Sequence, residues 1–255
     1  MTTVLSTNEG AVAILTIDRP RVRNAIDLAT MRELGRQVVT AVTDPSVRVI
    51  VITGSGPSAF SSGGDIAEMT TYAGLASDQA MLAWYETLRS IEESPKPVIA
   101  AINGFALGGG TELAMACHIR TASSGATLGQ PEIALDHLPG AGGTQRLPRL
   151  IALGLAYEYL LTGDSIPADE AKRMGLVNHV WPADELLPRT LALAARIAER
   201  SPIAITLTLE AIRLGLQGSL DVGLRLERAL AGLVLESDEA KRGLEVFLQK
   251  RNRHR

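Results

Sequence analysis

The chain has 255 residues, of which 46% are hydrophobic and 21% charged, so it can bury a sizeable core as one large domain or as one domain with an appendage. A net charge of −3 and an aromatic content of 4% argue against nucleic acid as the main partner, because they indicate neither a basic patch nor a base-stacking surface. The single cysteine, Cys117, excludes an intramolecular disulfide and argues against a thiolate metal site.

The N-terminal sequence, MTTVLSTNEGAVAIL, does not resemble a targeting segment. It lacks the basic stretch and apolar run of a secretory signal, and it is not an Arg-rich amphipathic transit peptide. No apolar run reaches the roughly 20 residues that a bilayer-spanning helix needs. We therefore expect a cytoplasmic protein with no membrane partner.

The first half of the chain alternates between strands and helices. Apolar, partly β-branched runs predict strands at 11–18, 47–54 and 96–104, the last two buried on both faces. Helical spacing of apolar residues predicts helices at 27–42 and 78–91. This alternation predicts an α/β layered core.

From about Leu147 onward the pattern is mostly helical. We expect one helix at 149–163 ended by Gly163, a short helix at 167–175 followed by a strand at 176–181, and amphipathic helices within 184–202, 203–218, 219–237 and 237–251. Ser237 is the expected N-cap of the last helix. A helical tail of this length either wraps the core or docks on a partner subunit.

Two glycine clusters each follow a predicted strand, in "AFSSGGDIAEM" (59–69) and "GFALGGGTELA" (104–114). The simplest interpretation is a pair of tight turns. A P-loop is excluded because no Lys-Ser or Lys-Thr follows, and the glycine spacing is not that of a dinucleotide site. If the turns face one another at the edge of a sheet, their backbone N–H groups would form an oxyanion hole.

Two glutamates lie near these glycines. Glu112 stands three residues after Gly109, so one helical turn would bring its carboxylate to the side of the Gly109 N–H. Glu132 follows Pro131, which predicts a turn at the end of a strand. The alternatives are a first-turn residue that favours the helix dipole and an exposed loop glutamate. As a pair, they would suit the addition or removal of water, one as base and one as acid.

Other catalytic patterns are weaker. The four histidines are scattered without metal-ligand spacing, so we expect no metal site. No G-x-S-x-G motif is present, which argues against that type of serine hydrolase.

Taken together, these motifs resemble the crotonase (enoyl-CoA hydratase/isomerase) family over almost the whole chain. The similar blocks, in order, are "RPRVRNAID", "AFSSGGDIAEM", "AINGFALGGGTELAMAC", "GQPEIALDHLPGAGGTQRLPRLIA", "ADEAKRMGLVNHVWP" and "EVFLQKR". The resemblance implies an α/β spiral of β-β-α units at 1–195 and a C-terminal helical region at 196–255 for oligomerisation and completion of the CoA site. It also implies a homotrimer or a dimer of trimers.

The resemblance assigns site residues by position. The oxyanion-hole N–H groups fall on Gly64 and Gly109, and the two catalytic glutamates on Glu112 and Glu132. The implied contacts to the CoA part of the substrate are Arg21, Val22, Ala59, Asp65, Ile66, Phe247 and Lys250, the last two often from a neighbouring subunit. The substrate would be an acyl-CoA thioester, with no separate cofactor, since coenzyme A is part of the substrate.

The glutamate pair favours hydration of a 2-enoyl-CoA to a 3-hydroxyacyl-CoA. The alternative is another reaction of the family, such as enoyl-CoA isomerisation or a specialised acyl-CoA dehydration, and a non-catalytic binding role is a third possibility that the retained pair opposes. Departures from the family pattern are His118 in place of aspartate, Asp136 and His137 in place of glycine and a small or apolar residue, and Ala67 in place of a frequent lysine. We expect His118 to be structural, and Asp136 and His137 to bear on acyl specificity.

Overall fold

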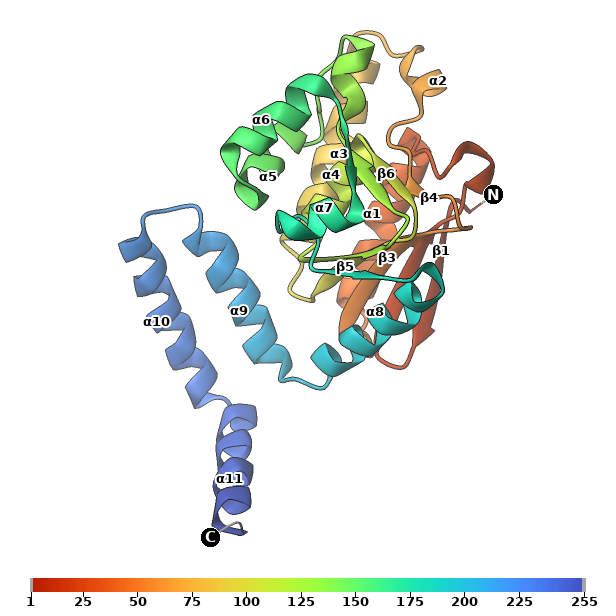
Figure 1. Cartoon of the computed structure of the whole chain (residues 1–255). Helices are drawn as coiled ribbons and strands as arrows, with labels where there is room; N and C mark the ends of the chain where they lie inside the picture. Colours follow the sequence, from red (N-terminus) through yellow and green to blue (C-terminus); the bar gives the residue numbers. More distant parts are fainter. Residues whose placement is uncertain (1, 254–255) are drawn as a thin grey trace. The chain divides into compact units, whose positions relative to one another are not determined.

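The computed structural model describes residues 2–253, and these divide after Ala195 into two compact units (Figure 1). The first is a mixed α/β unit and the second is helical.

A six-stranded sheet crosses the first unit, in the order β1-β2-β3-β5-β7-β10. Its strands are β1 (Val4–Glu9), β2 (Val12–Ile17), β3 (Val49–Gly54), β5 (Val98–Ile102), β7 (Ile119–Ser123) and β10 (His179–Trp181). β1 pairs antiparallel with β2, and all other pairs are parallel. Every residue of β3 and β5 is buried, which confirms the prediction of strands covered on both faces. β1 was not predicted from the sequence, and its residues after Val4 are not buried.

A second sheet has four strands in the order β4-β6-β8-β9. They are β4 (Ala59–Ser61), β6 (Phe105–Leu107), β8 (Thr127–Gly129) and β9 (Ser165–Pro167). β4, β6 and β8 are parallel to one another. The pairs β3-β4, β5-β6 and β7-β8 each give one strand to each sheet and then pass into helical structure, so the chain advances as a spiral of β-β-α units, as expected.

Helices surround these sheets in the first unit. They are α1 (Leu28–Thr43), α2 (Ile66–Met69), α3 (Leu75–Glu92), α4 (Gly109–Ala116), α5 (Gly143–Leu150), α6 (Leu153–Thr162), α7 (Ala168–Arg173) and α8 (Ala183–Ala198), with 3-10 turns η1 (Pro20–Val22) and η2 (Pro131–Leu135). Asp27 caps α1 by accepting a hydrogen bond from the Thr30 N–H at 2.7 Å. Glu112 lies in the first turn of α4, and this helix begins at the glycines, as predicted.

The prediction of a single helix at 149–163 is wrong. The structure breaks it after Leu150, because Ile151 turns into an extended conformation and is buried. α6 then begins at Leu153 and ends, as expected, at Gly163, which has a left-handed φ of 73°. Helical periodicity alone continues across such a break and therefore does not reveal it.

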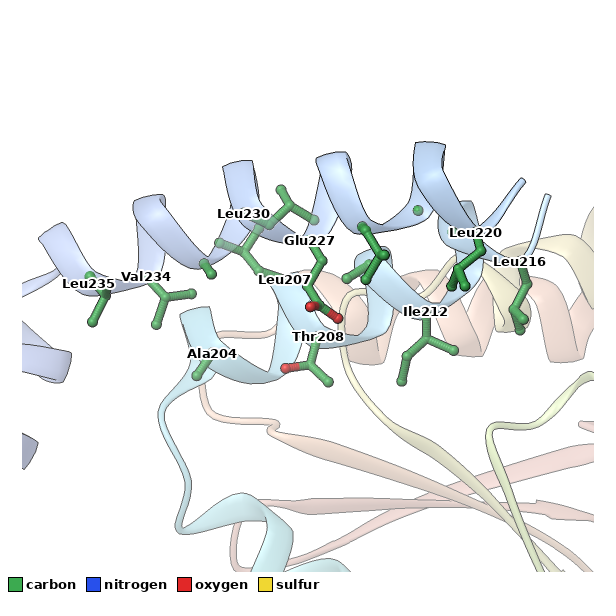
Figure 2. Close-up of a pocket in the computed structure, with 15 residues that line it drawn as sticks. Ala204, Leu207, Thr208, Ile212, Leu216, Leu220, Glu227, Leu230, Val234 and Leu235 are labelled. Carbon is green, nitrogen blue, oxygen red and sulfur yellow. The ribbon is translucent and has the colours of Figure 1, made fainter. Parts of the chain in front are cut away.

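The second unit contains α9 (Pro202–Gly215), α10 (Leu220–Glu236) and α11 (Asp238–Arg253). α9 and α10 form a hairpin with an apolar groove of about 660 Å³, shown in Figure 2. The predicted cap at Ser237 is confirmed, since its hydroxyl accepts a hydrogen bond from the Ala240 N–H at 3.2 Å. Across residues 2–253, no helix combines the length and apolarity needed to cross a membrane.

Candidate active site

The candidate site lies at one edge of the four-stranded sheet. Gly64 follows β4, Gly109 follows β6 and Glu132 follows β8, and because these strands are parallel their carboxyl ends meet at the same edge. Together with Glu112 these residues line one cavity of about 340 Å³. The four residues that the sequence placed in a catalytic centre are therefore brought together.

The two glycine turns lie against each other. A Cβ atom on Gly63 would stand 3.1 Å from the Gly109 nitrogen. Within residues 2–253, neither the Gly64 nor the Gly109 N–H donates a hydrogen bond to another protein group. Two unpaired N–H donors beside one cavity are the arrangement needed to stabilise a developing oxyanion.

The glycines at 108 and 109 permit two close approaches. Gly108 has a φ of 51°, and a Cβ there would lie 2.9 Å from Glu132 Oε1. A Cβ on Gly109 would lie 2.5 Å from Cη2 of Trp84, a side chain only 6% exposed. The Trp84 ring therefore packs closely against Gly109 in the lining of the cavity.

Glu112 is 2% exposed and held by backbone donors. Its Oε1 accepts hydrogen bonds from the Ala141 N–H at 2.8 Å and the Gly143 N–H at 2.7 Å. Burial raises the pKa of Glu112, while these two donors and the cation of Arg146 counteract the rise. The contacts favour the ionised carboxylate, the form that a general base requires.

Glu132 lies in η2 and is partly buried. Burial raises its pKa to about 7, and the negative charge of Glu112 adds to the rise. If the Gln130 side-chain amide is turned over so that its nitrogen faces Glu132, it can donate to both carboxylate oxygens at 3.0 Å. Two carboxyl groups in one cavity with different tendencies to ionise suit one acid and one base.

Several proposed CoA contacts lie beside the oxyanion turn. Ser62 N–H donates to the Arg23 carbonyl at 3.0 Å, which holds the segment with Arg21 and Val22 against residues 62–66. Val22 is 46% exposed, and Ile66 is 54% exposed and lines the cavity. Asp65 caps α2 and forms an ion pair with Arg19 at 3.1 Å.

Of the remaining proposed CoA contacts, one is buried in the first unit and two belong to the second unit. Ala59 lies inside β4 at 1% exposure and is enclosed by the core, so its side chain is not available to a ligand. Phe247 is in the second unit and 63% exposed. Lys250 is on α11, and its side chain lies outside the described residues.

The departures from the family pattern have visible structural settings. His118 is mostly buried, and its Nδ1 accepts a hydrogen bond from the Val98 N–H at 3.0 Å, in agreement with a structural role. Asp136 ends η2 with a left-handed φ of 53°, a conformation that aspartate tolerates better than most residues. His137 lines the cavity, and Ala67 is exposed on α2.

Sequence reasoning missed three features of the site. It did not identify Trp84, the Gln130 contact to Glu132, or the use of residues 141–143 to hold Glu112. The glycine-rich stretch at 140–143 is visible in the sequence, but it does not reveal that its N–H groups bind a carboxylate. The described residues contain no group of His, Cys, Asp and Glu placed to hold a metal ion.

The chain matches the Enoyl-CoA hydratase/isomerase family model over residues 7–254. It is 43% identical to a crotonyl-CoA hydratase of Syntrophomonas wolfei, covering 97% of this chain and 95% of the relative. It is 40% identical to a short-chain-enoyl-CoA hydratase of Clostridium acetobutylicum, with 97% and 95% covered. The crystal structure of an enoyl-CoA hydratase from Bacillus anthracis superimposes with a TM-score of 0.94 at 39% identity, covering 97% and 96% of the two chains. The chain therefore belongs to the enoyl-CoA hydratase/isomerase family, with the crotonase fold.

Proposed function

We propose that this protein is a hydro-lyase that adds water across the 2,3 double bond of a 2-enoyl-CoA thioester to give a 3-hydroxyacyl-CoA. The observation that carries the proposal is the meeting of Glu112 and Glu132 with two unpaired N–H donors in one cavity. The relatives named as hydratases support it. The retained glutamate pair favours hydration over the isomerase and specialised dehydratase alternatives.

In this mechanism the N–H groups of Gly64 and Gly109 bind the thioester oxygen, where negative charge grows as water attacks C3. Glu112 takes a proton from the water, and Glu132 gives its proton to C2. Each of the two glutamates would contribute on the order of 10²–10⁴ in rate. We propose no separate cofactor, because coenzyme A belongs to the substrate and these four groups supply the charge and protons.

We expect purified protein to hydrate crotonyl-CoA. Adding water removes the conjugation between the double bond and the thioester, so the ultraviolet absorbance of the enoyl thioester falls with time. The product is checked as 3-hydroxybutyryl-CoA by mass spectrometry. A protein that leaves crotonyl-CoA and longer 2-enoyl-CoA thioesters unchanged would not be the proposed hydratase.

Hydration is expected to show a bell-shaped pH dependence of kcat/KM. Glu112 must be ionised, so activity falls as pH drops through its pKa, which lies above the ordinary 4.5. Glu132 must carry a proton, so activity also falls as pH rises beyond about 7. Initial rates at subsaturating crotonyl-CoA, measured over about four pH units around neutrality, test both limbs. A rate that stays level up to pH 9 would argue against Glu132 as the acid.

We also propose that the protein is a homotrimer or a dimer of trimers, assembled through the second unit. Neither α9 nor α10 contains a fully buried residue, and their groove exposes large apolar side chains such as Leu216 at 82% and Leu220 at 78%. Such a surface is typical of an interface. Sedimentation velocity should give three or six times the chain mass of 27.1 kDa, and a monomer at micromolar concentration would contradict it.

Phe247 and Lys250 are proposed to complete the CoA site in that assembly, and a cytoplasmic location is proposed for the whole protein. The support for the first is their place in the matched family region. The support for the second is the lone Cys117, which is a buried free thiol.

A further inference from the structure

Arg146 of α5 joins two parts of the first unit that are distant in sequence. Its Nε and Nη2 atoms donate to the two carboxylate oxygens of Glu92, at 2.6 and 2.7 Å, which forms a two-pronged ion pair with the end of α3. Its Nη1 atom donates to the Ala141 carbonyl at 2.6 Å. The Arg146 side chain is 18% exposed, so solvent screens these contacts only in part.

The segment that Arg146 holds is the one that binds Glu112. The carbonyl of Ala141 faces the guanidinium group, while the N–H groups of Ala141 and Gly143 bind the Glu112 carboxylate. Gly142 between them has a φ of 104°. A turn built on adjacent glycines has little intrinsic preference for one conformation, so its shape depends on contacts from outside.

We propose that Arg146, anchored by Glu92, is a positioning residue that fixes residues 141–143 in the conformation that binds Glu112 as an anion. This inference rests on the proposed function, because it assigns Glu112 the role of base. Arg146 touches neither Glu112 nor the acyl site through a hydrogen bond, and it acts through the turn and through its charge. Arg146 and Glu92 can each be replaced without altering a catalytic group.

The charged surroundings of Glu112 come from several elements. Burial raises the pKa of Glu112, the cation of Arg146 on α5 counteracts part of that rise, and Glu132 on η2 lies in the same cavity. Glu92 on α3 offsets part of the Arg146 charge, while Arg120 on β7 pairs with backbone carbonyls of Leu176 and Cys117. Loss of Arg146 therefore removes the cation that acts on Glu112 and loosens the turn that donates to it.

A merely structural role predicts something different. If the ion pair only ties α3 to α5, its loss would lower thermal stability and leave the catalytic pH dependence alone. The chain offers a matched control, since Arg173 and Glu170 on α7 form a similar fork outside the cavity. Arg146→Met, Arg146→Lys and Glu92→Gln can therefore be compared with Arg173→Met.

The experiment measures kcat, KM and the pH profile with crotonyl-CoA, together with the melting temperature. We expect Arg146→Met to lower kcat by about a hundredfold with little change in KM, and to move the acid limb to higher pH. Arg146→Lys should recover part of kcat, Glu92→Gln should lose about tenfold, and Arg173→Met should match the wild type. A kcat within twofold of wild type and an unmoved acid limb in Arg146→Met would overturn the proposal; if that variant does not fold, the same result in Glu92→Gln would do so.

A second readout does not depend on hydration. Carbon-13 NMR of carboxyl-labelled glutamate follows the titration of Glu112, whose signal is identified by its loss in Glu112→Gln. We expect the midpoint to rise by about one pH unit in Arg146→Met. If the midpoint is the same in Arg146→Met and in the wild type, the positioning role is refuted, even in an active enzyme. If the midpoint shifts in Arg146→Met but the wild type hydrates no enoyl-CoA, only the proposed function is refuted.

Discussion

Glu112→Gln is expected to lower kcat for crotonyl-CoA hydration by about 10²–10⁴-fold while the protein stays folded. The amide has nearly the shape of the carboxylate, and its oxygen can still accept the N–H groups of Ala141 and Gly143. It cannot take a proton from water. Because the exchange also removes a buried charge, we expect no fall in melting temperature, so the loss would belong to the chemical step.

Glu132→Gln should lose a similar factor, since an amide cannot deliver a proton to C2, whereas the exposed Glu158→Gln is the matched control and should leave kcat unchanged. Stopped-flow or steady-state loss of enoyl absorbance measures all three variants. KM should change little if the glutamates act mainly in the transition state. Full activity in either cavity variant would remove that carboxylate from the mechanism.

The placement of these glutamates could be anticipated from sequence because local rules govern it. A strand, a glycine turn and a helix follow one another around Gly109, so helical geometry alone brings Glu112 to the turn. The parallel alignment of β4, β6 and β8 then brings the turns together. Runs of β-branched residues that end at a glycine are strong signals of such units. The resemblance to a family indicated the order in which the units follow one another.

The long-range contacts around the site could not be predicted from the sequence in the same way. Trp84 meets Gly109, and Arg146 meets Glu92, across 25 and 54 positions of the chain. No periodicity or motif reports which side chain packs against a given backbone at such separations. The buried state of Ala59 was missed for a related reason, because a short strand inside a similar block gives no sign of which residues face the ligand. Long-range packing decides these details.

Gly109→Ala is expected to reduce kcat by about 10²–10³-fold, through displacement of one oxyanion donor. The backbone at this position does not have a positive φ, and alanine favours helices, so local strain is not the cause. The new methyl group would instead stand 2.5 Å from Cη2 of the buried Trp84. Because the indole is almost wholly buried, we expect the start of α4 to shift and to carry the Gly109 N–H with it. Gly154→Ala on α6, where an added Cβ meets nothing within 4 Å, is the control and should keep full activity.

The same geometry predicts a rescue that a general loss of stability would not produce. Replacing Trp84 by the smaller phenylalanine makes room for the methyl group, so Gly109→Ala combined with Trp84→Phe should recover about tenfold in kcat over Gly109→Ala alone, the positive coupling expected for residues in contact. A double-mutant cycle on kcat, with melting temperatures for all four proteins, measures that coupling. If the effects of the two changes are simply additive, the contact with Trp84 does not set the position of the Gly109 amide. If Gly109→Ala alone keeps wild-type kcat, the 109 amide is not the oxyanion donor, because an amide aimed at a growing negative charge cannot be moved without loss of rate.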